Sequence, residues 1–288
     1  MIADNKTNIV YLSELLRSDI RYTKTCNEIT TILDSFQIPC KFLENTNDIW
    51  ARDYMPIQVS ENKFIEYRYD PDYLQGLKPD ERDSKTYPDL VCESLNFKTV
   101  KSNIILDGGN VIKSSNCVIL TDKIFKENEK HYDRTQLIDK LKELFEVDKI
   151  VIIPWDKSEP YGHADGMIRF IDNSTVLING YFRDREYSKR FQKEFFGSLE
   201  LNGLKYKELT YNVPNPNEDL NWAYINFLQT KDLILVPKFG IEEDEQAYEQ
   251  IKNSFSEYSN QNRIFQVNMN ETAKYDGALN CITWTVME

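Results

Sequence analysis

The chain has 288 residues, of which 41% are hydrophobic and 12% aromatic, so it can form one large domain or two ordinary ones and does not read as disordered. Its net charge of −12 disfavours a nucleic-acid partner, because phosphate binding requires the opposite sign, and would suit a cationic small substrate. No apolar run approaches the ~20 residues of a membrane span, and residues 1–6 show no signal peptide.

The five cysteines are odd in number and widely spaced. They form no Cys-x-x-Cys pair and no Cys/His cluster, so we expect neither a disulfide framework nor a zinc site. A reducing cytoplasm fits this composition best. We expect no metal and no cofactor. The composition leaves open whether the chain forms a homo-oligomer.

In chain order, the apolar pattern predicts short strands alternating with helices. A strand at 8–12 precedes a helix with apolar positions from Cys26 to Phe36, and a charged surface loop is expected at 68–86. The helix at 133–145 has the clearest apolar stripe, with Asp133 as its N-cap. Further helices are predicted at about 88–97, 186–200 and 245–258. Further strands are predicted at 56–59, 64–67, 104–106, 111–112, 118–120, 150–153, 175–178, 224–228, 233–236, 264–267 and 280–286.

Polar turns recur between these strands at nearly constant spacing. Their key residues, Asp53, Asp107, His163, Asn226 and Cys281, are separated by 54, 56, 63 and 55 positions. Five equal units in 288 residues would each span about 58. Five like units around an axis would bring these turns together at one central site.

The turn from Tyr161 to Gly166 carries one of only two histidines in the chain. On an extended backbone, residues two apart point to the same face, so His163 and Asp165 would face one site. The glycines at 162 and 166 permit sharp turns beside them.

Five short blocks, in order, resemble the motifs of the agmatine deiminase and bacterial-type peptidylarginine deiminase family. Trp50–Pro56 resembles its Trp-x-Arg-Asp-x-x-Pro motif, and Asp107–Asn110 its acidic-Gly-Gly motif. Gly162–Asp165 looks like its Gly-His-x-Asp, while Tyr224–Phe227 and Asn280–Trp284 are similar to its last two blocks. The resemblance covers residues 45–286 and implies a guanidine-modifying enzyme. It also implies an α/β five-bladed propeller, the pentein fold, with one catalytic domain over residues 1–288.

Two positions depart from that family's pattern. Asn280 stands where the family often has histidine, directly before the cysteine. Asp107 stands where many agmatine deiminases have glutamate. Both departures bear on the choice of substrate more than on the chemistry.

The reaction implied is hydrolysis of a guanidinium to a ureido product and ammonia. A guanidinium is a planar cation with N–H donors in a fixed fork, so carboxylates should hold it, and Asp53 and Asp165 are the candidates. Cys281 would be the nucleophile that forms a covalent thiouronium intermediate. His163 would protonate the departing ammonia and then activate water. Asp107 would be either a third contact to the guanidinium or the partner that orients His163.

Three more residues are assigned to substrate binding. Trp50 could stack on the cation, although a tryptophan that only packs is about as common. Asn110 closes the acidic-Gly-Gly motif, and Asn226 is expected at the wall or turn of the site. The substrates considered are agmatine, which would place the enzyme in polyamine biosynthesis, and an arginine derivative.

Other functions stay open at this point. The same fold could carry amidino transfer, or hydrolysis of free or methylated arginine. A non-catalytic pentein would be a binding module, but it has no use for Cys281 with His163 and Asp165. A papain-like hydrolase places its cysteine before its histidine, whereas here the cysteine comes last.

Overall fold

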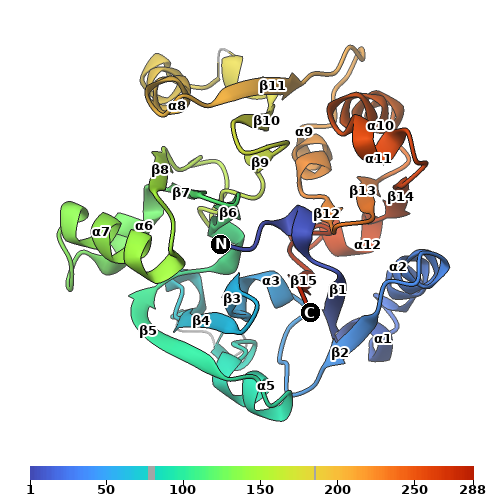
Figure 1. Ribbon diagram of the computed structural model, residues 1–288. Coiled ribbons are helices and arrows are strands. Elements are labelled where there is room, and N and C mark those ends of the chain that lie inside the picture. The colour runs from blue at the N-terminus through green and yellow to red at the C-terminus, as the bar shows by residue number, and fades with distance from the viewer. Residues whose placement is uncertain (77–81, 185) are drawn as a thin grey trace.

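In the computed structural model, which describes residues 1–76, 82–184 and 186–288 but not the side chain at 218, the strands form five sheets of three strands each. The sheets surround a common centre, with most of the long helices on the outside (Figure 1). In spatial order the sheets are β15 (Thr283–Val286), β1 (Ile9–Ser13) and β2 (Cys40–Leu43); β3 (Ile57–Ser60), β4 (Lys63–Arg68) and β5 (Thr99–Ile105); β6 (Ile112–Lys113), β7 (Cys117–Thr121) and β8 (Lys149–Ile153); β9 (Ile168–Phe170), β10 (Thr175–Asn179) and β11 (Lys205–Leu209); β12 (Leu228–Gln229), β13 (Ile234–Lys238) and β14 (Ile264–Asn268).

Every sheet repeats one pairing pattern. Its central strand is antiparallel to one neighbour and parallel to the other. A parallel pair needs a crossover connection, which helices supply here. The crossover helices are α2 (Thr23–Ser35), α5 (Pro88–Ser94), α6 (Lys123–Asn128) with α7 (Arg134–Phe145), α8 (Lys189–Leu201), and α10 (Glu243–Ser254) with α11 (Ser256–Ser259). The five repeated units confirm the predicted α/β five-bladed propeller.

The two ends of the chain meet in the first sheet. Strand β15 pairs with β1 in antiparallel register, with Val286 opposite Ile9 and Thr283 opposite Leu12. The last segment of the chain thus supplies the strand that the first unit would otherwise lack. This pairing closes the ring, and both termini lie toward its centre (Figure 1).

Helix α7 shows how local sequence sets an element. Asp133 is its N-cap and forms a capping box with Gln136, as the sequence predicted for the cap. Its stripe of Leu137, Leu141 and Phe145 is buried. The helix ends at Glu146, which adopts the left-handed conformation with φ 53°.

Two of the central strands, β1 and β7, are buried on both faces. All five residues of β1 and all five of β7 are buried. This explains why they read as continuous apolar runs rather than as alternating patterns.

Three predicted strands have different bounds in the structure. Residues 224–228 form a 3-10 helix, η5 (Trp222–Ile225), followed by the two-residue strand β12, because Asn226 N–H donates to the Ala223 carbonyl and closes a turn. The strand predicted at 280–286 begins only at Thr283, so Cys281 lies in the turn before it. Strand β5 begins at Thr99, earlier than the predicted 104–106.

The remaining short elements lie between or before the sheets. The predicted loop 68–86 contains η2 (Asp72–Leu74), and its residues 77–81 fall outside the described residues. In the part of the chain that the structure describes, no helix is both long and apolar enough to cross a membrane. The other short elements are α1 (Leu15–Ser18), α3 (Ala51–Tyr54), α9 (Glu218–Asn221), α12 (Asn270–Ala273), η1 (Asp4–Lys6), η3 (Gly108–Asn110) and η4 (Gly180–Arg183).

Candidate active site

The five connections that lead from one sheet to the next carry the predicted site residues. Each connection leaves the third strand of one unit and enters the first strand of the next, so all five lie at equivalent positions in the ring. In chain order they carry Asp53 on α3, Asp107 before η3, His163 and Asp165 between β8 and β9, Asn226 after η5, and Asn280 with Cys281 before β15. Hydrogen bonds and ion-pair contacts link these side chains into one buried group.

His163 lies between two carboxylates. Its Nε2 is 3.0 Å from Asp107 Oδ2, and its Nδ1 is 3.7 Å from Asp53 Oδ1. Burial lowers the pKa of His163, but Asp53 and Asp107 outweigh burial and raise that pKa to about 10. His163 is therefore a cation at neutral pH and can act as a proton donor.

Two glycines allow these groups to approach each other. Gly109 N–H donates to Asp53 Oδ1 at 3.0 Å. A Cβ at position 109 would lie 2.6 Å from that oxygen and 2.7 Å from His163 Nδ1, and one at position 108 would lie 1.9 Å from the Arg52 carbonyl oxygen. A side chain at position 109 would push the carboxylate and the imidazole apart, and one at position 108 would displace the backbone at Arg52.

Asp53 lies in a strongly perturbed environment. Its carboxylate is buried, with the acidic Asp107 and Asp165 and the basic His163 acting on it. Burial raises the pKa of Asp53 to about 8, with Asp107 and Asp165 adding to the increase and His163 opposing it. A cation bound beside Asp53 would favour its ionised form.

Cys281 faces acceptor oxygens on two other connections. Its thiol lies 3.6 Å from Asp165 Oδ2 and 3.4 Å from Asn226 Oδ1. The same Asn226 oxygen accepts the Cys281 backbone N–H at 3.3 Å. Burial, followed by the charges of Asp165 and Asp53, raises the pKa of Cys281 well above its usual value. The cysteine is thus a thiol, and it needs a nearby positive charge to become a thiolate.

Asn280 links the cysteine loop to Asp165. Its Nδ2 donates to Asp165 Oδ2 at 2.7 Å, and its Oδ1 is buried without a hydrogen-bond partner. Arg52 holds the same loop from the other side, since its backbone N–H donates to the Cys281 carbonyl and its Nε donates to the Asn280 carbonyl. Asn280 therefore orients the carboxylate that faces the thiol.

The other predicted binding residues lie outside this cluster of contacts. Trp50 packs on Gly277, where an added Cβ would be 2.0 Å from the indole Cζ3. Asn110 uses its Oδ1 to accept the Thr121 backbone N–H at 2.8 Å. Neither residue lines the cavity described next, and their assignment to substrate binding stays a prediction.

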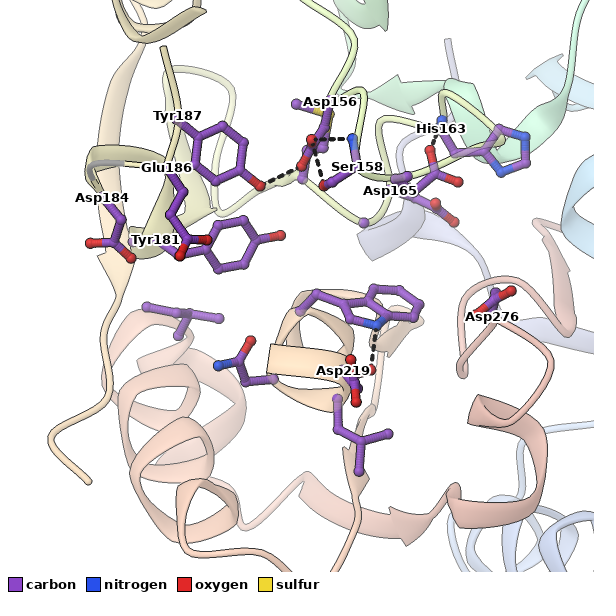
Figure 2. Close-up of a pocket in the computed structure, with 18 of the residues that line it drawn as sticks. Asp156, Ser158, His163, Asp165, Tyr181, Asp184, Glu186, Tyr187, Asp219 and Asp276 are labelled. Carbon is purple, nitrogen blue, oxygen red and sulfur yellow. Dashed lines mark hydrogen bonds between the residues drawn. The ribbon is translucent and has the colours of Figure 1, made fainter. Parts of the chain in front are cut away.

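A cavity of ≈ 1420 Å³ reaches His163, Asp165 and Cys281 at one of its walls. Figure 2 shows its other walls, where Tyr181, Tyr187 and Asp219 lie across from the histidine. Among its described lining residues are seven carboxylate side chains and two lysines. Such a cavity favours a cationic ligand.

Sequence reasoning missed two residues beside this group. Tyr73 and Lys123 both approach Asp107, at 3.2 Å and 4.0 Å from Oδ2. Tyr73 lies in the stretch predicted as a surface loop, and Lys123 begins a helix, so neither showed a pattern that points to a site. All five cysteines are free, and among the described residues no group of three His, Cys, Asp or Glu side chains could hold a metal ion.

The five-unit ring, with a cysteine, a histidine and aspartates on its inter-sheet connections, is a pentein fold. The solved structure of the C. jejuni agmatine deiminase has a TM-score of 0.78 to this chain at 20% sequence identity, and the match covers 100% of this chain and 95% of that one. A cysteine-to-serine variant of the same protein with substrate bound gives a TM-score of 0.77 at 19% identity, covering 100% and 96%.

The sequence assigns the chain to a particular family within this fold. The model of the Porphyromonas-type peptidyl-arginine deiminase family matches residues 10–286, and the chain belongs to that family. A curated protein of Marinomonas sp., named for agmatine deiminase activity, is 23% identical over 84% of this chain and 74% of its own length.

Proposed function

We propose that this chain hydrolyses a terminal guanidinium group to a ureido group and ammonia, with agmatine as the preferred substrate. The observation that carries the proposal is the arrangement at the cavity wall: the Cys281 thiol lies 3.6 Å from Asp165, and His163 lies between Asp53 and Asp107. It joins a nucleophile, a proton donor and acceptors for a planar cation. Family membership and the likeness to agmatine deiminases support the same reaction.

Substrate charge would activate the nucleophile. The carboxylates of Asp53 and Asp165 raise the pKa of the Cys281 thiol, with burial as the larger cause. A guanidinium held by those two carboxylates neutralises them and adds a positive charge beside the sulfur. The thiol then loses its proton to solvent, and the thiolate forms only when substrate is in place.

In the remaining steps, His163 transfers the protons. The thiolate attacks the guanidinium carbon, and the C=N π electrons move to nitrogen to give a neutral tetrahedral adduct. His163 gives its proton to the leaving –NH₂, so that ammonia departs and a cationic thiouronium remains. Neutral His163 then takes a proton from water as the hydroxyl adds to carbon, and loss of the thiolate, with proton return, yields the ureido product.

Cavity charge supports agmatine over free arginine. Arginine carries a carboxylate that would face the seven lining carboxylates, whereas the second group of agmatine is an ammonium. Of the described lining residues, Lys157 and Lys274 are the only lysine or arginine side chains, and His163 already faces Asp53 and Asp107. The pairing of β15 with β1 supports treating residues 1–288 as one catalytic domain. A cytoplasmic location stays a prediction from cysteine usage.

A substrate panel tests the proposal. Ureido product and ammonia would be measured with agmatine, free arginine, methylated arginine and an arginine-containing peptide, for the native chain and for Cys281→Ser. We expect turnover with agmatine, at least ~10³-fold less turnover in the variant, and no product from arginine. The absence of product from every substrate would favour a binding module, and full activity in Cys281→Ser would rule out the covalent mechanism.

A further inference from the structure

Tyr73 shares an oxygen atom with the histidine of the site. It lies on η2, in the segment between β4 and α5, and its hydroxyl donates to Asp107 Oδ2 at 3.2 Å. The same Oδ2 receives His163 Nε2 at 3.0 Å, while Oδ1 of Asp107 is buried without a partner. Both donors therefore compete for the charge of one carboxylate oxygen.

Ion pairs hold η2 in this position. Asp72, the neighbour of Tyr73, is 3.2 Å from the ammonium groups of both Lys123 and Lys126. Lys123 is buried, lies 4.0 Å from Asp107 Oδ2 and also pairs with Glu127 at 3.3 Å. The Tyr73 hydroxyl is thus fixed at the carboxylate by contacts that do not involve the cavity.

The ring of Tyr73 forms the back of the histidine site. It packs edge-on against Tyr161 at 5.0 Å between ring centroids and lies 6.2 Å from the His163 ring. Tyr73 is not among the residues that line the cavity, whereas Tyr161 is. Burial raises the pKa of Tyr73 well above its usual value, so its hydroxyl keeps its proton and stays a donor. The hydroxyl of Tyr73 therefore acts on the histidine through Asp107, while its ring packs beside the histidine directly.

We propose that Tyr73 is a positioning residue of this centre. Its hydroxyl donates a hydrogen bond to Asp107 Oδ2 and so weakens the hydrogen bond that Asp107 accepts from the His163 Nε2 proton. The inference rests on the proposed deiminase function, in which His163 gives up a proton and takes one back in each turnover. A carboxylate with no second donor binds the imidazolium more tightly and slows that transfer. The titratable groups that interact electrostatically with His163 or Asp107 include Asp53, Tyr67, Tyr69, Tyr73, Lys123, Glu127 and Glu159, and the Tyr161 ring packs beside the His163 ring.

The substitution Tyr73→Phe removes only the hydroxyl and keeps the ring contacts. We expect kcat with agmatine to fall about fivefold, the effect of one hydrogen bond, while KM changes less than twofold because Tyr73 does not line the cavity. The matched control is Tyr248→Phe, since the Tyr248 hydroxyl on α10 donates to the Ile264 carbonyl of β14. The control should leave kcat and KM unchanged.

A spectroscopic readout separates this inference from the proposed function. The chain has only two histidines, so the Nε2 proton of His163 can be assigned by NMR with a His131→Gln variant. At neutral pH and without substrate, we expect Tyr73→Phe to move that proton downfield, as its bond to Asp107 strengthens. In an Asp107→Asn background, the same substitution should have no further effect on the signal.

Two results would overturn the inference. The first is an unchanged or upfield signal in Tyr73→Phe, and the second is an equal shift with and without the Asp107 carboxylate. Failure of the native chain to release ammonia from any substrate would remove the proposed function. The NMR comparison would still decide whether Tyr73 and His163 share Asp107.

Discussion

Two groups of charged side chains are buried in the ring, and they differ in what supports them. The catalytic group, defined as Asp53, Asp107, His163, Asp165 and Cys281, lies on the connections between sheets. The second group, here called the axial ion group, consists of Asp4, Arg52, Lys113 and Arg169. Lys113 and Arg169 lie on the strands β6 and β9.

The axial ion group has a carboxylate that is paired directly with cations. Asp4 Oδ1 is 3.0 Å from Lys113 Nζ, and its Oδ2 is 3.0 Å from Arg169 Nη2. Burial raises the pKa of Asp4, but Lys113 and Arg169 outweigh burial and hold that pKa well below its usual range. Arg169 also donates to the Phe227 carbonyl. An internal carboxylate thus forms ion pairs with two of the three cations of this group.

The catalytic group leaves its charges unbalanced. The group holds three aspartates against one histidine, Asp53 has a pKa raised to about 8, and Asp107 Oδ1 is buried without a hydrogen-bond partner. Burying a charge without a counter-ion is costly, so a site of this kind persists only where a ligand can complete it. The same residue types thus serve stability where a carboxylate is paired with cations and substrate binding where carboxylates outnumber cations.

The largest effects should come from neutralising one aspartate in each group. Asp4→Asn leaves Lys113 and Arg169 without their counter-ion, so we expect the free energy of unfolding to fall by about 3–5 kcal/mol. Asp53→Asn removes an acceptor for the guanidinium, so we expect kcat/KM to fall ~10²-fold or more with no loss of stability. Urea unfolding at pH 7 and steady-state kinetics with agmatine measure both. Equal losses of stability in the two variants would break the distinction between the groups.

The pH dependence should separate the groups next. We expect kcat/KM to rise toward pH 8, as Asp53 ionises, and to fall above about pH 10, as His163 loses its proton. Asp4 should not appear in the profile because its pKa lies below this range. A bell-shaped profile from initial rates with agmatine would support the assignment. A flat profile between pH 6 and 8, in a buffer series at constant ionic strength, would contradict the role of Asp53.

The same pKa shifts predict opposite effects on stability. The folded-state pKa of Asp53 is raised, so its contribution is complete below about pH 4 and is lost as the pH rises to about 8. The folded-state pKa of Asp4 is lowered, so its contribution is present above about pH 4 and is lost as the pH falls further. Unfolding free energies of the native chain, Asp53→Asn and Asp4→Asn across this range would show the two slopes.

The smallest effect concerns how the loop of the catalytic group is held. In Gly277→Ala the new Cβ would lie 2.0 Å from Trp50 Cζ3, so the ring or the loop that carries Cys281 must move. We expect a threefold to tenfold loss in kcat and a stability loss of about 1–3 kcal/mol. Gly197→Ala in α8 is the control, because nothing lies within 4 Å of its added Cβ. It should leave kcat unchanged and stabilise the helix slightly. An unchanged kcat in Gly277→Ala would show that the loop adapts freely.

Much of the fold could be predicted from local patterns. The apolar stripe of α7 and its Asp133 cap depend on neighbouring residues in the sequence, and both are confirmed. Residues 224–228 were read wrongly as a strand, because a run that is buried on all sides has no period from which to tell strand from helix. The start of the last strand was misplaced for the same reason.

The candidate site could be predicted as a set of residues but not as a set of contacts. The spacing of Asp53, Asp107, His163 and Cys281 implied that they would meet, since each ends a unit of similar length. Nothing local showed which oxygen faces which nitrogen. Asn280 was read as a departure from a motif, and only the distances show that it bonds Asp165.

The sequence by itself determined the order of elements, the five units and the kinds of side chain at their turns, because each depends on residues within one unit. Only the tertiary contacts show that Asp107 binds His163 and Tyr73 together, that Asp4 pairs with both Lys113 and Arg169, and that Cys281 is a thiol. These properties depend on distances and burial between segments 50 or more residues apart, or on loops without periodicity. Electrostatic energies at such contacts vary with ångström changes in separation, and a linear pattern does not contain that information.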